Sequence, residues 1–182
     1  MDTSDLRDFQ SQPQRRAILD ERARALATLS VADTSVDGEL TIRFRLGDGR
    51  YALSARHARE IQPLRAFSPL FGAPSFISGL VNVHGRLLAL IDIRPLLNLP
   101  AHPPLPGSFL IVLEGEGNEI ALLTDSILGM TTDPLSLSPA PDGATHTPVL
   151  WVRGVDRDLS LVIDPIGLLA DPRLIVEYHA GA

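Results

Sequence analysis

The chain has 182 residues, a formal net charge of −6 and a hydrophobic fraction of 45%. Such a hydrophobic fraction can build a packed core, which excludes a wholly disordered chain. The acidic balance argues against a nucleic-acid-binding protein, since affinity for phosphates rests on Lys and Arg. The absence of cysteine excludes disulfides, thiolate metal sites and a cysteine nucleophile. The N-terminus has no apolar secretory region and no window reaches the roughly 18 apolar residues of a spanning helix, so we expect a cytosolic protein without direct membrane insertion.

Residues 1–38 are predicted to form an N-terminal helix and a linker. Ser11 and Gln14 fit a capping box at the start of a helix that runs to Leu29. Its apolar stripe is imperfect, and the turn-rich segment 33–38 follows. Two interpretations stay open for this helix: it packs loosely on the domain or frays, or it binds a partner.

The first half of the remaining chain has the pattern of β-strands. Apolar and polar residues alternate over residues 40–46, and a Gly-Asp-Gly turn at 47–49 predicts a hairpin. Residues 55–61 fit either a strand or a short helical turn. The apolar stretch 77–92 predicts two strands joined by a turn at His84-Gly85, followed by a helical turn over 94–99.

The second half repeats this arrangement. Strands are predicted over residues 109–114, 119–125, 149–152 and 159–164, with a helical turn over 166–169. Asp92 and Asp164 lie 72 positions apart, at the ends of matching apolar segments. Chance similarity of leucine-rich strands is the alternative explanation, because short apolar matches are weak.

Closely spaced strands without long intervening helices favour small antiparallel barrels. We therefore expect a mainly β fold of two small five-stranded antiparallel β-barrels, with an N-terminal α-helix and short helical turns. The expected domain boundaries are 39–99 for the first barrel, 100–107 for a proline-rich connector, 108–172 for the second barrel and 173–182 for a C-terminal tail.

No catalytic constellation is recognisable. The five histidines are scattered, without the spacing or the partners of a metal site, so we predict no enzyme, no metal and no cofactor. Asp92 and Asp164 could form a carboxylate pair, but a strand-to-helix junction favours an N-cap role for each. Asp125 is interpreted in the same way, as a turn former.

The central segment, residues 77–94, resembles the CheW family of chemotaxis coupling proteins. The matching residues are Gly79, Asn82, Gly85, Asp92 and Arg94. In the second half, Asp125, Gly154 and Asp164 also match, and the resemblance extends over about residues 39–172. One residue departs from the family pattern: the arginine of its Asn-Leu-Arg-Gly segment is His84 here.

This resemblance implies a non-enzymatic scaffold with two protein partners. These are the cytoplasmic tip of a methyl-accepting chemoreceptor and the regulatory domain of a CheA-type histidine kinase, in arrays at the inner face of the membrane. The implied kinase-facing residues are Asp142 and Gly143. His84 is either a solvated turn residue or part of the receptor contact, with Arg86 supplying the lost charge. The receptor-facing residues that the resemblance implies are Ala58, Glu60, Asn82, His84 and Arg86.

Three other functions compete with this reading. The first is a CheW-like adaptor in a non-chemotactic kinase pathway, such as surface motility. A small β-barrel binding module of unrelated function is the second, although a nucleic-acid-binding barrel would need a basic, aromatic face. A small hydrolase is the third, and it would need a polar constellation that the sequence lacks.

Overall fold

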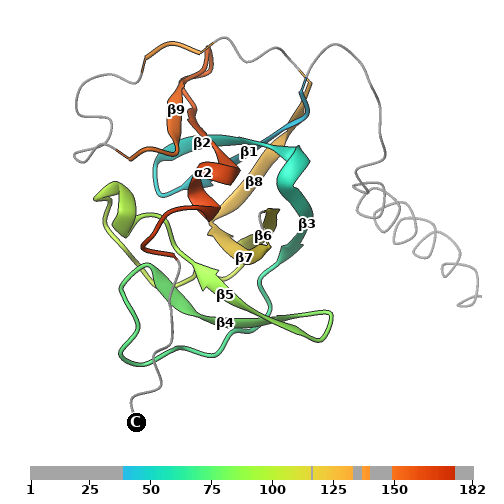
Figure 1. The fold of residues 1–182 in the computed structure, drawn as a ribbon, viewed down its shortest axis with the longest axis vertical. Coiled ribbons are helices and arrows are strands. Elements are labelled where there is room, and N and C mark those ends of the chain that lie inside the picture. Colours follow the sequence, from blue (N-terminus) through green and yellow to red (C-terminus); the bar gives the residue numbers. More distant parts are fainter. Residues whose placement is uncertain (1–38, 116, 133–136, 140–148, 175–182) are drawn as a thin grey trace, which may run out of the picture. The chain divides into compact units, whose positions relative to one another are not determined.

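The computed structural model describes residues 39–115, 117–132, 137–139 and 149–174, all within the unit Asp33–Ala182. The predicted N-terminal helix and linker lie outside the described residues, as do Asp142 and Gly143. The part of the chain that the structure describes is mainly β-structure (Figure 1).

The first half contains five strands and two short 3₁₀ helices. They are β1 (Thr41–Leu46), β2 (Gly49–Ser54), η1 (Ala55–His57), β3 (Ala58–Pro63), β4 (Ile77–Val83), β5 (Arg86–Ile91) and η2 (Pro95–Leu97). The ambiguous stretch 55–61 contains both predicted alternatives, since η1 leads directly into β3. Ser54 caps η1 by accepting a hydrogen bond from the backbone N–H of Arg56.

Within its described residues, the second half repeats the order with five strands and one α-helix. They are β6 (Phe109–Gly115), β7 (Asn118–Thr124), β8 (Ser126–Thr131), β9 (Val152–Val155), β10 (Leu161–Ile163) and α2 (Pro165–Leu169). Two expectations are corrected. β8 was not predicted, because its pattern is weak, and β9 begins only at Val152, where a strand had been expected to end.

The ten strands form two sheets with the same plan. Sheet A has the order β8-β1-β2-β10-β9 and sheet B the order β3-β6-β7-β5-β4. Each strand of sheet A has a counterpart at the same place in the other half of the chain, for example β6 for β1. Writing these counterparts in the order of sheet A gives the order of sheet B, so the topology supports the duplication. Each sheet also contains one parallel pair, β2 with β10 and β5 with β7, amid the expected antiparallel pairs.

The sheets do not follow the ranges 39–99 and 108–172. Each half supplies its first hairpin to one sheet and its third strand and second hairpin to the other. β3 leaves sheet A to pair with β6, and β8 returns from sheet B to pair with β1. The halves therefore interlock through backbone hydrogen bonds, because each supplies strands that the other's hairpin needs as neighbours.

Each sheet closes on itself through one backbone bridge. In sheet B, Ser68 follows edge strand β3 and exchanges two hydrogen bonds of 2.8 Å with Leu80 of the opposite edge strand, β4. In sheet A, Ser138 and Val155 exchange two bonds of 2.9 Å in the equivalent place. Such closure satisfies edge groups that would otherwise be free to pair with other chains.

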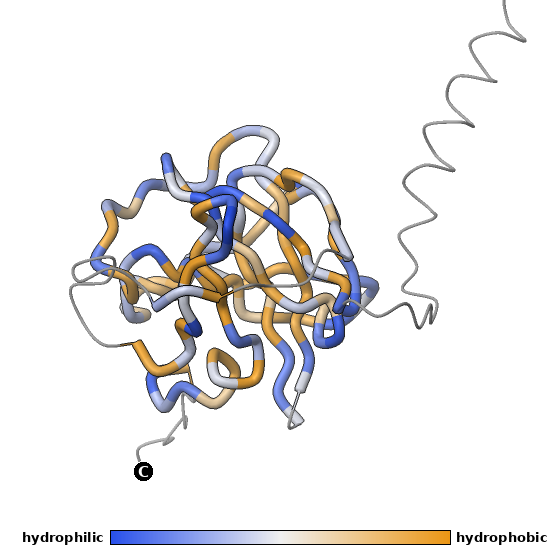
Figure 2. Tube along the Cα trace, turned by 90° about the horizontal axis from the view of Figure 1, so that it is seen from above, coloured by the Kyte–Doolittle hydropathy of each residue, from blue (hydrophilic) through white to orange (hydrophobic). Residues whose placement is uncertain are grey.

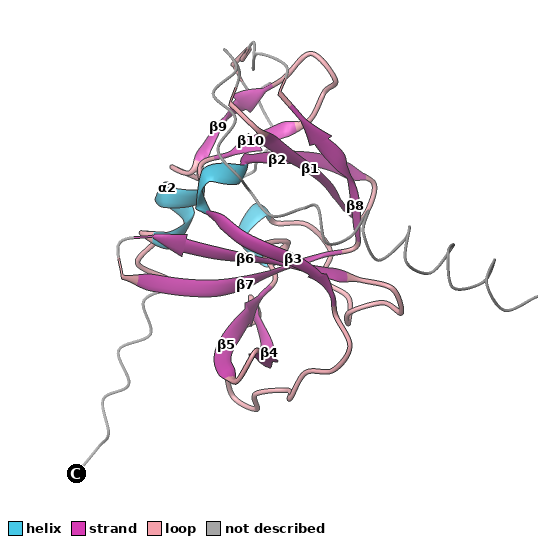
Figure 3. Ribbon diagram, turned by 90° about the vertical axis from the view of Figure 1, so that its right-hand side faces the viewer, coloured by secondary structure: helices cyan, strands magenta, loops and turns pink. Residues whose placement is uncertain are grey.

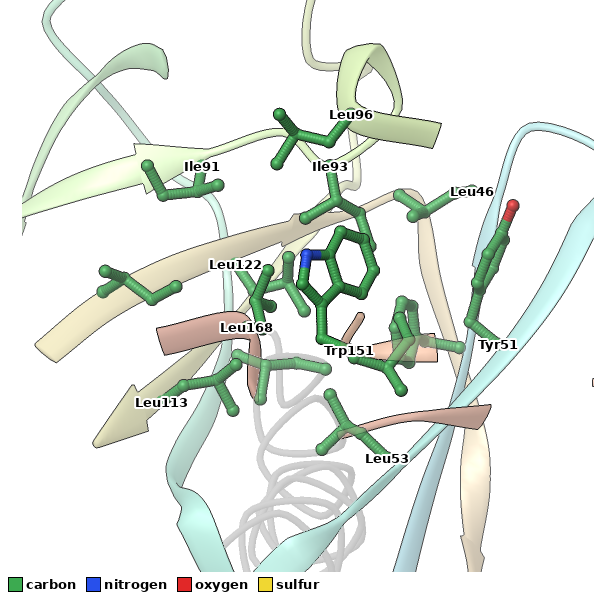
Figure 4. Packing of buried hydrophobic residues seen from close by; sticks show 14 of the residues in the cluster. Leu46, Tyr51, Leu53, Ile91, Ile93, Leu96, Leu113, Leu122, Trp151 and Leu168 are labelled. Carbon is green, nitrogen blue, oxygen red and sulfur yellow. The ribbon is translucent and has the colours of Figure 1, made fainter. Parts of the chain in front are cut away.

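Two apolar clusters stabilise the described residues. The larger lies between the sheets, where Trp151 packs among Leu53 and Tyr51 from sheet A and Leu113 and Leu122 from sheet B (Figures 3 and 4). The smaller covers the other face of sheet B. Strands β6 and β7 contribute alternate residues to both clusters, which explains their continuous apolar runs. Hydrophobic stretches accordingly follow the strands, and the hairpin turns are more hydrophilic (Figure 2).

A partly buried ion pair, Asp171 with Arg173, lies beside Trp151 at the end of the described chain. The indole Nε1–H of Trp151 donates to Asp171 Oδ2 at 2.8 Å, and Arg173 donates to the same carboxylate at 2.5 Å. The hydrogen bond from Arg173 is the main reason that the pKa of Asp171 falls to about 2, although burial acts in the opposite direction.

This ion pair predicts a loss of stability in acid. Because the pKa of Asp171 is lower in the folded state, its contribution is present above about pH 4, the range of an unfolded aspartate, and is lost as the pH falls towards 2. We expect Asp171→Asn to cost about 1–2 kcal/mol at neutral pH and to weaken the acid dependence. Urea unfolding followed by Trp151 fluorescence tests this, with exposed Asp48→Asn as control. Equal acid sensitivity of Asp171→Asn and wild type would contradict it.

Candidate functional site

The β4–β5 hairpin ends in a tight turn at His84-Gly85. Both residues have positive φ, 50° and 85°, which is the signature of a type I′ turn. The backbone N–H of Gly85 donates to Asn82 Oδ1 at 2.8 Å and holds the turn. Histidine is tolerated in this left-handed region less readily than glycine or asparagine, so the turn carries some strain.

Glu60 on β3 joins the opposite edges of sheet B at this turn. Its Oε2 lies 2.9 Å from His84 Nε2, and its Oε1 lies 3.6 Å from Arg86 Nη2. Since an ionised carboxylate only accepts, Nε2 carries the hydrogen in this contact. The fold thereby brings together three of the residues implied by the resemblance. His84 and Arg86 lie 24 and 26 positions after Glu60 in the sequence.

The structure adds three charged residues that the sequence reasoning missed. Arg86 pairs with Glu119 of β7, and Arg59 of β3 lies 2.9 Å from Glu114 of β6 and 3.9 Å from Glu119. A bulge between Ala58 and Glu60 sets the direction of Arg59. The sequence contains no signal for these pairs beyond the acidic character of the β6–β7 hairpin. We call His84, Glu60, Arg86, Glu119, Arg59 and Glu114 the charged surface of sheet B.

The β4–β5 hairpin also carries an exposed leucine, on the opposite face of β5 from Arg86. Leu87 pairs with Asn82 across the hairpin and is 70% exposed, which is unusual for a large apolar side chain in a strand. It adds an apolar contact that the sequence reasoning did not single out. Ala58, in contrast, is 8% exposed and belongs to the larger apolar cluster. Its side chain does not reach the charged surface, so Ala58 only places β3.

Asp92 and Arg94 lie apart from this surface, in a buried polar cluster. They are 2% and 1% exposed, and Arg94 Nε donates to Asp92 Oδ1 at 2.9 Å. Arg94 also contacts His102 of the connector and lies 3.4 Å from Asp125 Oδ1. Asp125 in turn accepts from the backbone N–H of Gly47 at 2.6 Å. Asp125 therefore ties the β1–β2 turn to the strands of sheet B, which is more than the turn-forming role expected.

The two strand-end aspartates behave differently. Asp164 is the N-cap of α2, as predicted, and its Oδ1 accepts from the backbone N–H of Ile166 at 3.1 Å. Asp92 accepts from the backbone N–H of Arg94, but η2 begins later and has Arg94 as its N-cap. The N-cap prediction for Asp92 is wrong because η2 begins only at Pro95; the Asp92 carboxylate instead accepts from both the backbone and the side chain of Arg94.

Gly79 and Gly154 occupy equivalent positions beside the two closing bridges. Their φ angles are 153° and 148°. A Cβ atom at Gly79 would lie 2.2 Å from the carbonyl oxygen of Ser68, and at Gly154 2.4 Å from that of Ser138. Only glycine allows the backbones to approach this closely. These glycines are therefore structural, as is Gly85 in its turn.

The described ranges contain no cluster of three or more His, Asp or Glu side chains that could hold a metal ion. No helix among the described residues is long and apolar enough to cross a membrane. What these residues do offer to a partner is paired charges and an exposed leucine beside a rigid hairpin.

These features define a class: small β-proteins in which a duplicated chain builds two interlocked five-stranded sheets. The family model described as CheW-like domain matches residues 41–173, and the chain belongs to this family. Its relatives include the chemotaxis protein CheW of Rhizobium meliloti, 28% identical over 65% of this chain and 77% of that protein. Protein PilI of Pseudomonas aeruginosa is 26% identical over 80% of this chain and 89% of that protein.

A solved structure has the same fold. The scaffolding protein TtCheW from Thermoanaerobacter tengcongensis matches with a TM-score of 0.59 and 21% sequence identity. The match covers 70% of this chain and 88% of that one. The predicted CheW-like family and its mainly β fold of two five-stranded sheets are thus confirmed.

Proposed function

We propose that this protein is a non-enzymatic scaffold that couples the cytoplasmic tips of chemoreceptors to the regulatory domain of a CheA-type histidine kinase. Membership of the CheW-like family supports this role. The observation that carries the proposal is the charged surface of sheet B, which contains Glu60, His84 and Arg86. Receptors that span the membrane would hold the scaffold at its inner face.

The charged surface suits binding better than stabilisation. The side chains of His84 and Arg86 are 73% and 39% exposed, and exposed ion pairs contribute only about 0–1 kcal/mol to folding. Its two arginines and three glutamates give a net charge of −1 with neutral His84. A partner that presents a complementary charge could exchange with these pairs, while Leu87 supplies apolar contact area.

His84 gives this surface its particular character. An arginine at this position would keep a permanent charge and five donors, whereas a histidine ring held by Glu60 keeps one further nitrogen for a partner. Arg86 supplies a permanent charge two residues away. We therefore expect the receptor contact to rest on Glu60, Asn82, His84 and Arg86 together, with His84 as the residue that distinguishes this chain.

The receptor-facing and kinase-facing residues can be tested in one assay that measures binding to each partner separately. We expect Glu60→Arg and His84→Ala to weaken capture by a receptor-tip fragment at least about tenfold, because the first reverses a charge and the second removes the ring that contacts Glu60. The same variants should bind a CheA regulatory domain normally. Asp142→Arg, in the proposed kinase-facing segment with Gly143, should do the reverse. Variants that bind both partners like wild type would contradict the assignment.

His84→Asn provides a control for folding. Asn-Gly is a preferred type I′ pair, so this variant should be as stable as wild type or more stable, while it loses the ring that Glu60 orients. Reduced receptor capture at unchanged or higher unfolding midpoint would identify a contact role. Full receptor capture by His84→Asn would show that His84 is merely a solvated turn residue.

A second candidate function is an adaptor role in a kinase pathway that does not control chemotaxis. The similarity to a protein named PilI supports this second function. It covers 80% of this chain, against 65% for the CheW of Rhizobium meliloti. The two functions predict the same kinase capture but different receptor tips. Capture of a kinase domain without any chemotaxis receptor tip would favour the second function.

A further inference from the structure

The duplication allows the two sheets to be compared position by position. Val112 pairs with Ala121 in sheet B, and Arg43 pairs with Ala52 in sheet A. Leu90 pairs with the same Ala121, as Val162 does with Ala52. The face of sheet B that carries the smaller apolar cluster therefore corresponds to the face of sheet A that carries Arg43, Ala52 and Val162.

The two equivalent faces differ sharply in chemistry. On sheet B the eight buried residues of the smaller cluster are all apolar, namely Leu110, Val112, Ala121, Leu123, Val81, Val83, Leu88 and Leu90. In sheet A six of the eight counterparts are polar or charged. In the same order these counterparts are Thr41, Arg43, Ala52, Ser54, Asp156, Asp158, Ser160 and Val162.

The polar residues of sheet A are connected through Arg43. Its Nη1 lies 2.7 Å from Asp156 Oδ2 and 3.0 Å from Asp158 Oδ2, and it donates to Ser160 Oγ at 3.1 Å. Asp156 is 5% exposed, and its Oδ1 accepts from the backbone N–H groups of Asp158 and Ser160. One guanidinium of β1 therefore holds the whole turn between β9 and β10. We call these four residues the polar latch.

Two further features weaken the same part of the molecule. Leu159, within the turn, has a φ of 57° and is 81% exposed, so a bulky residue occupies a strained conformation without burial in return. Near the other end of the face, a cavity of about 160 Å³ is lined in part by Ser54 and Val162. Both β9 and β10 are short, with four and three residues.

We propose that the polar latch lets the β9–β10 edge of sheet A open while sheet B stays closed. Opening sheet B exposes leucines and valines to water, whereas opening sheet A releases charged and hydroxyl groups that water hydrates well. The free energy of local opening is therefore lower in sheet A. The chain then has one rigid sheet and one adaptable sheet.

Equivalent amides make this proposal measurable. The N–H of Val155 donates to Ser138 as that of Leu80 donates to Ser68, and the N–H of Asp164 donates to Trp151 as that of Asp92 donates to Phe76. By native-state hydrogen exchange we expect protection factors at least tenfold lower for Val155 and Asp164 than for Leu80 and Asp92. Equal protection within each pair would overturn the proposal.

Substitutions test whether the polar latch causes the difference. Arg43→Val/Asp156→Val copies Val112 and Val81 into sheet A, and we expect the protection of Asp164 to rise at least about tenfold towards that of Asp92. Asp158→Asn removes only an exposed partner of Arg43, so the protein should fold, and the protection of Asp164 should fall severalfold while that of Asp92 stays unchanged.

Asp48→Asn, which removes an exposed charge in the β1–β2 turn, serves as the control. If the double variant does not fold, Asp158→Asn alone decides. Parallel changes at Asp164 and Asp92, or no change at either, would show that the polar latch does not govern local opening.

Discussion

Replacement of Arg94 by methionine is expected to destabilise the protein by about 3–5 kcal/mol, because it leaves the carboxylate of Asp92 buried without its cation. Methionine preserves much of the apolar stem, so lost packing contributes little. The effect should extend to both sheets, since Arg94 also approaches Asp125, which holds the β1–β2 turn. Urea unfolding followed by fluorescence of Trp151, the only tryptophan in the chain, measures the change.

A second substitution separates the contribution of the Arg94 charge to stability from that of its shape. Asp92→Asn in the Arg94→Met background removes the uncompensated charge and keeps an acceptor for the backbone N–H of Arg94. We expect this double variant to recover part of the lost stability, a coupling that a double-mutant cycle quantifies. Arg56→Met is the matched surface control and should cost less than about 1 kcal/mol. An effect of Arg94→Met as small as that of the control would refute the importance of this cluster.

A comparable loss, about 3–5 kcal/mol, is expected for Gly79→Ala. The new Cβ would meet the carbonyl oxygen of Ser68 at 2.2 Å, and the φ of 153° is unfavourable for alanine. The backbone bridge between Ser68 and Leu80 would have to separate, which reopens the edge of sheet B. Gly154→Ala should act in the same way on sheet A, where the distance to Ser138 is 2.4 Å.

Gly129→Ala separates the cost of the backbone conformation from that of the close contact between the new Cβ and a neighbouring carbonyl. Gly129 has a similar φ of 143°, but an added Cβ would have no neighbour within 4 Å. This variant should lose only the backbone contribution, about 1–2 kcal/mol. Thermal or urea unfolding of the three variants then ranks them. If Gly79→Ala and Gly129→Ala lose the same stability, backbone conformation alone explains both, and the close approach to Ser68 does not matter.

The difference between the two equivalent faces has a bearing on adaptor function. An adaptor must keep one surface fixed while it fits a second partner, and local opening of one sheet offers such freedom without loss of the other. The charged surface belongs to the sheet that carries the smaller apolar cluster, whereas the polar latch belongs to the other sheet. Rigid and adaptable contacts would thereby be assigned to the two different sheets of one small chain.

Sequence reasoning found most strands because their signals are local. Alternation over residues 40–46, the Gly-Asp-Gly turn and the apolar runs of the second hairpin are each readable within ten residues. β8 was not predicted because a Gly lies within it and its residues are half-buried or exposed, so no alternation of buried and exposed positions marks it. Its partner, β1, lies some 85 residues earlier, and only that pairing makes it a strand.

For the candidate site, the sequence identified Glu60, Asn82, His84 and Arg86 through resemblance, but it contained nothing about their geometry. Glu60 meets His84 and Arg86 only because sheet B curls until its edges approach. Arg59, Glu114 and Glu119 join the charged surface through adjacent strands, whose order local patterns do not reveal. Ala58 was expected at the surface and is buried, since the bulge beside it turns its side chain towards the core. Neighbours across a curled sheet are set by strand order, which local patterns do not encode.

The sequence by itself determined the repeated unit of this protein: its hairpins, its loops and the apolar character of its strands, because short-range periodicity and turn chemistry act within a few residues. It also showed that Asp92 and Asp164 are equivalent in position. Only the tertiary structure decided that the two halves exchange strands. It also decided that Asp92 pairs with Arg94 while Asp164 caps a helix. On equivalent faces, one sheet buries leucines where the other holds Arg43 and its partners. Hydrogen bonds and ion pairs between distant residues form only once the chain has folded, and here they make two similar sequence repeats into two different sheets.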